Sequence, residues 1–250
     1  VQLISIPEIT VNDLHLHELT DQALPVMARY NRPPTIFARS GQLVRIRKDE
    51  NGNCVIEMLS EAALRGILSR CARFMVWVGR DCKPTKPPMS LVNDILSLPG
   101  WPEFAPISGI VTSPVIGPDG KVHGPGYDPV TKTFYAGDLR LNIPAKPTKE
   151  EAAECGKYIL DEVFGDFPFA DEASRANVLA ALLTVVTKHL VGGNTPLGLI
   201  DKPQAGTGAS LIAEIVAEIT TGNGACMETC PDSDEEWRKA ITSILMRGPQ

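Results

Sequence analysis

Residues 196–210 constrain the fold more than any other part of this 250-residue chain. An apolar run at residues 197–200 has the length and the boundaries of a buried strand, and a Gly-Thr-Gly turn follows at residues 206–208. From Leu211 to Ile219 the apolar residues repeat at helical spacing. The order strand, glycine loop, helix predicts the first unit of a parallel-sheet fold.

The glycine loop indicates a phosphate site that lacks one residue. Glycines let backbone N–H groups approach a phosphate closely, and the helix N-terminus adds about half a positive charge. In the pattern Gly-x-x-x-x-Gly-Lys-Ser/Thr a lysine follows the last glycine, whereas here Ala209 stands before Ser210 and Pro203 replaces the first glycine. A strand-to-helix turn without a ligand is the alternative interpretation.

Composition excludes several classes of protein. No apolar run approaches the roughly 20 residues of a membrane-spanning helix, and the first residues lack the features of a signal peptide. The six cysteines have no disulfide-framework spacing, and Cys226 and Cys230 lack the second pair that a zinc site needs. We therefore expect reduced thiols and a cytoplasmic protein.

Charge is divided along the chain. Residues 29–86 carry twelve Lys and Arg against five Asp and Glu, a net charge of +7, while residues 151–250 carry seven against fifteen, a net charge of −8. In the basic part, residues 35–39, 43–47 and 54–57 read as three strands joined by hairpin turns, which predicts an antiparallel meander.

The basic part is also a candidate DNA-binding surface, because phosphates bind cations and exposed bases stack on aromatic rings. Strand alternation places Arg45 and Arg47 on one face of their strand. Phe74, Trp77 and Tyr30 are interleaved with further basic residues, although core aromatics and solvated arginines would produce the same pattern. The predicted nucleic-acid contacts are Arg39, Arg45, Arg47 and Lys48.

Other elements are predicted from caps and periodicity. An edge strand that Pro7 ends is expected within residues 3–9, followed by a helix capped by Asn12 or Asp13 and ending near Tyr30. A helix from Ser60, a strand at 74–78 and a short helix at 91–98 are also expected. Capping boxes open helices at Thr148 and Ser233, Asp171 starts another helix, and residues 225–228 form a possible second strand. Asp119, Asp128 and Asp138 lie in or beside turns, where a structural role is expected.

Two prolines at 144 and 147 mark a domain boundary. We expect a mixed α+β domain over residues 1–146, a helical linker over 147–193, and the start of a P-loop ATPase domain over 194–250. The buried strand that carries the acidic Walker B residues would come next. We therefore expect the sequence, which also lacks an initiator methionine, to be part of a longer protein.

The chain resembles the primase-helicase type ATPases of phages and other mobile genetic elements. The resemblance lies in residues 31–37, 125–129, 166–169 and 174–177, in the glycine loop and in residues 235–239. It implies ATP and Mg²⁺ as ligands, DNA as partner, and a homo-oligomeric ring in the intact protein. The composition predicts no membrane partner. Gly206, Thr207 and Gly208 would hold phosphates and Ser210 would meet the magnesium ion. The loop residues implied in nucleotide binding are Gln204, Ala205, Gly206, Thr207, Gly208, Ala209, Ser210 and Leu211.

Two functions follow as hypotheses. The first is a fragment of a DNA helicase or primase-helicase that couples nucleotide binding to DNA unwinding, with hydrolysis weakened by Ala209. The second is a DNA-binding or assembly module on an ATPase-like fold that has lost its chemistry. A working ATPase in which Ala209 was substituted by design fits the same sequence.

Overall fold

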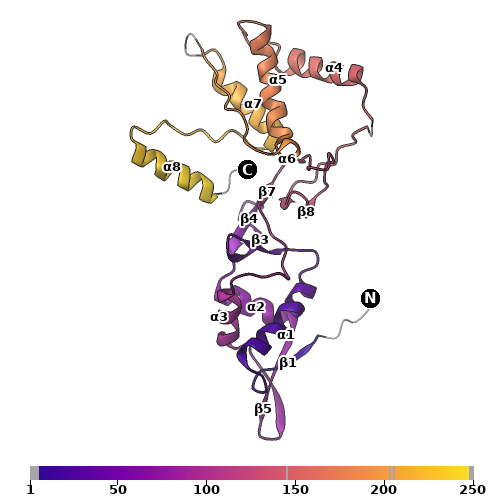
Figure 1. The fold of residues 1–250 in the computed structure, drawn as a ribbon, viewed down its shortest axis with the longest axis vertical. Helices are drawn as coiled ribbons and strands as arrows, with labels where there is room; N and C mark the ends of the chain where they lie inside the picture. Colours follow the sequence, from indigo (N-terminus) through magenta and orange to yellow (C-terminus); the bar gives the residue numbers. More distant parts are fainter. Residues whose placement is uncertain (1–5, 145, 203, 205, 248–250) are drawn as a thin grey trace. The chain divides into compact units, whose positions relative to one another are not determined.

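The computed structural model describes residues 6–144, 146–202, 204 and 206–247. This part of the chain has a mixed α/β fold with three small three-stranded sheets, eight α-helices and a short π-helix (Figure 1). The chain divides into two compact units, residues 1–108 and 109–250. The predicted boundaries at 146 and 193 stay predictions.

The first unit alternates strands and helices. In chain order its elements are β1 (Glu8–Thr10), α1 (Leu16–Tyr30), β2 (Ile36–Arg39), β3 (Gln42–Lys48), β4 (Cys54–Met58), α2 (Glu61–Cys71), β5 (Arg73–Val78), β6 (Asp81–Thr85) and α3 (Met89–Ser97).

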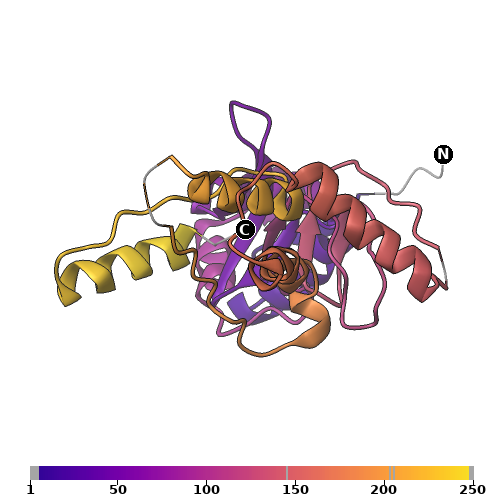
Figure 2. The same ribbon diagram turned by 90° about the horizontal axis from the view of Figure 1, so that it is seen from above.

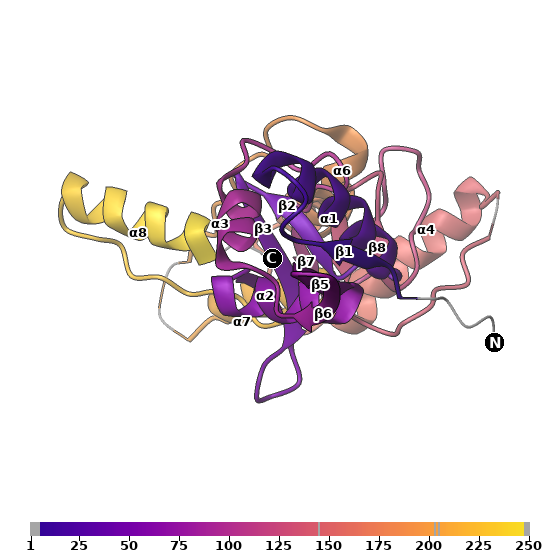
Figure 3. The same cartoon turned by 90° about the horizontal axis from the view of Figure 1, so that it is seen from below.

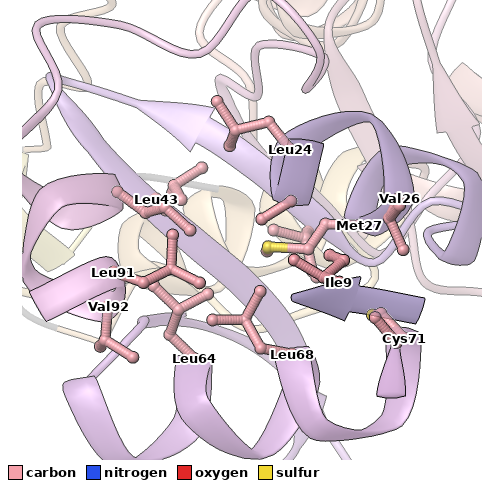
Figure 4. Close-up of a cluster of buried hydrophobic side chains, with 14 of the residues drawn as sticks. Ile9, Leu24, Val26, Met27, Leu43, Leu64, Leu68, Cys71, Leu91 and Val92 are labelled. Carbon is pink, nitrogen blue, oxygen red and sulfur yellow. The ribbon is translucent and has the colours of Figure 1, made fainter. Parts of the chain in front are cut away.

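Three helices enclose the core of the first unit. Met27 of α1, Leu64 of α2 and Leu91 of α3 are completely buried and belong to one apolar cluster, part of which Figure 4 shows. Thr20 of α1 donates a hydrogen bond to Asp94 Oδ2 of α3 at 2.6 Å. Helix α2 begins at its predicted cap, where the Ser60 hydroxyl accepts from the backbone N–H of Ala63.

The predicted meander is confirmed. Strands β2, β3 and β4 form an antiparallel sheet in that order. The first turn has Ser40 and Gly41 at φ 47° and 74°, and the second is closed by the Asp49 carboxylate, which accepts from the N–H groups of Asn51 and Asn53. Local turn chemistry therefore sets the register of this sheet.

A second sheet has the order β1-β5-β6, with β1 parallel and β6 antiparallel to β5. Strand β1 starts after Pro7, so that proline precedes the edge strand and does not end it. The prediction that Asn12 or Asp13 caps α1 is wrong, because His15 is the N-cap and forms a capping box with Glu18. Asn12 instead bonds to the backbone of Trp77.

The second unit combines a small sheet with helices. Its elements are β7 (Gly109–Val111), β8 (Gly126–Asp128), β9 (Thr133–Tyr135), α4 (Lys149–Tyr158), the π-helix η1 (Ile159–Val163), α5 (Glu172–Val186), α6 (Lys188–Val191), α7 (Ala209–Thr221) and α8 (Asp234–Arg247). The sheet order is β7-β9-β8.

Caps predicted from sequence start three of these helices. Thr148 and Glu151 form a complete capping box on α4, Asp171 caps α5, and the Ser233 hydroxyl accepts from the Glu236 N–H at the start of α8. Helix α5 packs against η1 and α7, and Figure 2 shows these helices from above. Phe164, in the apolar cluster between them, is completely buried.

Helix α7 is held at its C-terminal end by the segment that follows β7. Gly222 ends the helix at φ 71°, and the hydroxyls of Thr112 and Ser113 donate to the backbone carbonyls of Thr221 and Thr220. These bonds satisfy two carbonyls that have no partner inside the helix.

Two predicted strands are absent from the described residues. Residues 197–200 and 225–228 have no strand pairing, and Leu197 and Leu199 are 95% and 89% exposed. A buried parallel strand forms only beside another strand, and the described sheets offer none at these positions. Within the described part of the chain, no helix has the length and apolar character needed to cross a membrane.

Candidate functional site

The loop before α7 has the backbone shape predicted for a glycine loop. Gly206 and Gly208 adopt φ 84° and 85°, which favours glycine over residues with a side chain. Gly208 is also the N-cap of α7, and no side chain caps this end of the helix. The N–H groups of the first turn of α7 therefore have no intrahelical acceptor and no capping side chain.

Phe167 lies directly against this loop. A Cβ atom added at Gly208 would come within 2.9 Å of Phe167 Cε1, so a residue other than glycine would collide with the ring. Phe167 packs on the buried cluster of Phe164, Val178, Leu182 and Ile212. Two segments singled out in the sequence, residues 166–169 and the glycine loop, are therefore in contact.

The predicted loop residues are placed as follows. Thr207 donates from its hydroxyl to the carbonyl of Gln204 at 3.3 Å, which closes the turn. Ala209 and Ser210 open α7, with Ser210 exposed, while Leu211 is 55% exposed. The prediction for Ala205 lies outside the described residues, as does the position of Pro203.

The first turn of α7 carries no cationic side chain. Ala209 has no charge, and Lys202 is exposed on the segment that enters the loop. In the described ranges, no group of three or more His, Cys, Asp and Glu side chains could hold a metal ion.

The basic meander is partly neutralised. Arg45 and Glu57 face each other on β3 and β4, with Nη2 and Oε2 at 2.6 Å, and Arg47 Nε lies 3.1 Å from Glu57 Oε1. The hydrogen bond from Arg45 holds the pKa of Glu57 below its ordinary value. One carboxylate thus offsets two guanidinium groups on this face of the sheet.

The four predicted nucleic-acid residues do not share one surface. Arg39 is paired with Gln42, and strand alternation puts both on the same face as Lys48. Arg45 and Arg47 occupy the opposite face. The structure brings Arg45 and Arg47 together and separates Arg39 and Lys48 from them.

The aromatic residues of the basic part divide by burial. Phe74 is a core residue, 2% exposed, whereas Trp77 and Tyr30 are 45% and 52% exposed. The sequence alone allowed these rings to be either core residues or exposed rings that stack on bases. Strand alternation would have separated Phe74 from Trp77, since residues three apart on a strand face opposite sides.

The turn aspartates have structural roles, as predicted for Asp119 and Asp128. Asp128 is 7% exposed and accepts from the N–H groups of Val130 and Thr131 and from the Thr131 hydroxyl. Asp119 accepts from the N–H of Lys121. His123 lies between the two carboxylates, 3.3 Å from each.

Comparisons of the chain with protein-family models, with curated proteins and with solved structures found no match.

Proposed function

We propose that the loop before α7 binds the phosphate groups of a nucleoside triphosphate, and that the chain is part of a DNA helicase or primase-helicase type ATPase. The supporting observation is the pair of left-handed glycines, Gly206 and Gly208, which leads directly into the uncapped N-terminus of the 13-residue helix α7. Inward N–H groups and the positive end of a helix dipole attract anions.

Each loop residue has a defined part in this proposal. Backbone N–H groups from Gly206 to Leu211 donate to phosphate oxygens, the Ser210 hydroxyl meets the Mg²⁺ that accompanies ATP, and Gln204 closes the turn with Thr207. A charge-assisted hydrogen bond from a lysine at position 209 would contribute about 1.5–3 kcal/mol. Ala209 removes that contact, so we expect weak binding and slow turnover.

The proposal extends to fold and assembly. We propose that residues 194–250 begin a P-loop parallel-sheet domain and that the intact protein assembles as a ring on DNA. Leu197 and Leu199 support it, because their exposed side chains leave apolar surface for a sheet that includes further strands. The free state of all six cysteines supports a cytoplasmic location.

Ala209 favours a second candidate function, an assembly or DNA-binding module that has kept the shape of the loop without its chemistry. The two functions differ in one property. A module without chemistry would not gain nucleotide affinity when the missing cation is restored.

A titration with MgATP distinguishes them. We expect Ala209→Lys to bind MgATP about ten- to a hundredfold more tightly than the parent chain, which corresponds to the charge-assisted bond above. The matched control is Ala176→Lys, which adds the same charge at an exposed alanine of α5. Equal affinity of the two variants would overturn the nucleotide site.

A further inference from the structure

The β5–β6 hairpin extends from the first unit beyond helices α1, α2 and α3 (Figure 1) and lies near the centre of the view in Figure 3. Its two strands pair from Phe74 with Thr85 to Val78 with Asp81, and Gly79, at φ 66°, opens the two-residue turn. Every residue from 77 to 86 is exposed. Only the base of the hairpin, at Phe74, enters the core.

Trp77 is the large aromatic side chain of this hairpin outside the core. It is 45% exposed, whereas Trp101 is 5% exposed and donates from its indole N–H to the carbonyl of Ile95. The backbone beneath Trp77 is fixed by Asn12, whose side-chain amide donates to the Trp77 carbonyl and accepts from the Trp77 N–H. A large ring is thus presented to solvent on a strand whose backbone is held by Asn12.

Positive charge is concentrated in this hairpin. Strand alternation places Arg73 on the face of Trp77, Arg80 lies in the turn, and Lys83, which pairs with Val76, lies on the opposite face. Four basic residues, Arg73, Arg80, Lys83 and Lys86, stand in the hairpin segment against the single acid Asp81, a net charge of +3. In contrast to Arg45 and Arg47, none of the four forms an ion pair with another residue of the described chain. Their charges are available to an anionic partner.

The edge strand β6 is unfavourable for pairing with a strand of another protein. Strand β6 is the edge of its sheet and carries Lys83 and Pro84. A lysine and a proline on an edge strand oppose pairing with a strand of another protein. An exposed aromatic ring among unpaired cations fits a single-stranded nucleic acid instead, since bases stack on the ring and phosphates bind the cations.

We infer that the β5–β6 hairpin binds single-stranded DNA, with an unpaired base stacked on Trp77 and backbone phosphates held by Arg73 and Arg80. The inference rests on the proposed function only for the choice of DNA as the nucleic acid. It is tested without nucleotide or Mg²⁺, so a failure of the glycine loop to bind ATP leaves it intact.

The test is fluorescence anisotropy of a labelled oligothymidylate titrated with the 250-residue chain. We expect Trp77→Ala to weaken binding about five- to 150-fold, the range for loss of one base–aromatic stack, and Trp77→Phe to retain most of the affinity. Trp237→Ala is the matched control, because Trp237 is also exposed, at 43%, but belongs to α8. We expect no change in that variant.

The charges are tested by salt dependence. We expect the slope of log affinity against log salt to fall by about 1.4 in the variant Arg73→Ala/Arg80→Ala, because each phosphate contact with a single strand contributes about 0.7. Absence of DNA binding by the parent chain, or equal affinity of parent and Trp77→Ala, overturns the inference. Trp77-dependent binding to vesicles containing an anionic phospholipid, without binding to DNA, would assign the hairpin to a membrane surface instead.

Discussion

The side-chain amide of Asn12 forms two hydrogen bonds with the backbone of Trp77. Asn12 Nδ2 donates to the Trp77 carbonyl at 2.8 Å, and Asn12 Oδ1 accepts from the Trp77 N–H at 3.0 Å. Strand β1 ends two residues earlier, at Thr10. The side chain of Asn12 therefore continues the hydrogen bonding between β1 and β5 beyond the end of β1, with its amide taking the place of a backbone peptide group.

Replacement of Asn12 by alanine should loosen the hairpin. We expect Asn12→Ala to lower the free energy of unfolding by about 1–2 kcal/mol, because two hydrogen bonds are lost at a partly exposed site. We also expect faster amide hydrogen exchange at Trp77. Asn51→Ala, in the turn between β3 and β4, is the control and should leave exchange at Trp77 unchanged. Unaltered exchange in Asn12→Ala would show that β6 alone holds the strand.

Gly208 should be intolerant of a side chain. We expect Gly208→Ala to lower the free energy of unfolding by about 1–3 kcal/mol, because the new Cβ meets Phe167 and because φ is positive. Gly198→Ala has open space and no positive φ, so a change within about 0.5 kcal/mol is expected. Urea denaturation of both variants measures the difference, and equal stabilities would contradict the contact with Phe167.

Glu57 should restrain DNA binding by the meander. If Arg45 and Arg47 contact DNA as predicted, Glu57→Gln removes the charge that offsets them and should steepen the salt slope by about 0.7 for each guanidinium that gains a phosphate. The same anisotropy titration measures it. An unchanged slope, in a chain whose hairpin binds DNA, would remove this face from the DNA contacts.

Stability of the second unit should fall in acid through Asp128. Burial works to raise the pKa of Asp128, but hydrogen bonds from Thr131 and Val130 outweigh it and hold the pKa below its ordinary value. A carboxyl with a lowered pKa in the folded state stabilises the fold above the unfolded pKa, and the contribution is lost as pH falls below about 4.

Urea denaturation at neutral pH and near pH 3 tests this assignment. Asp128→Asn should be less stable at neutral pH and should lose less stability on acidification than the parent chain, since its side chain does not titrate. A parent and variant with parallel pH profiles would show that other carboxyls account for the acid sensitivity.

Local chemistry made much of the fold predictable. Ser60, Asp171 and the pair Thr148 and Glu151 cap the helices expected of them, because a cap depends on residues within one turn. The meander followed from strand alternation and turn residues for the same reason. Asn12 failed as a cap because its amide is engaged by Trp77, 65 positions away, a tertiary contact that no local pattern reveals.

The candidate site was predictable in part. The glycine loop and the start of α7 are where the sequence placed them, since Gly206 and Gly208 carry a backbone preference of their own. The strand expected at residues 197–200 is missing because strand formation requires a partner, which the apolar pattern does not supply. Arg45 meets Glu57 because the register of β3 and β4 places the two residues opposite each other. The positions of the two strands in the sequence do not give this register, so the ion pair was not predicted.

Helix α7 is fixed at both ends by residues that precede it in the chain. Phe167 lies against Gly208 at the start, and Thr112 and Ser113 bond to the last carbonyls at the other end. Because a helix is stiff along its axis, α7 links the position of the glycine loop to that of the segment after β7. Any change in the position of Gly208 would therefore also act on the hydrogen bonds of Thr112 and Ser113, at the other end of the helix.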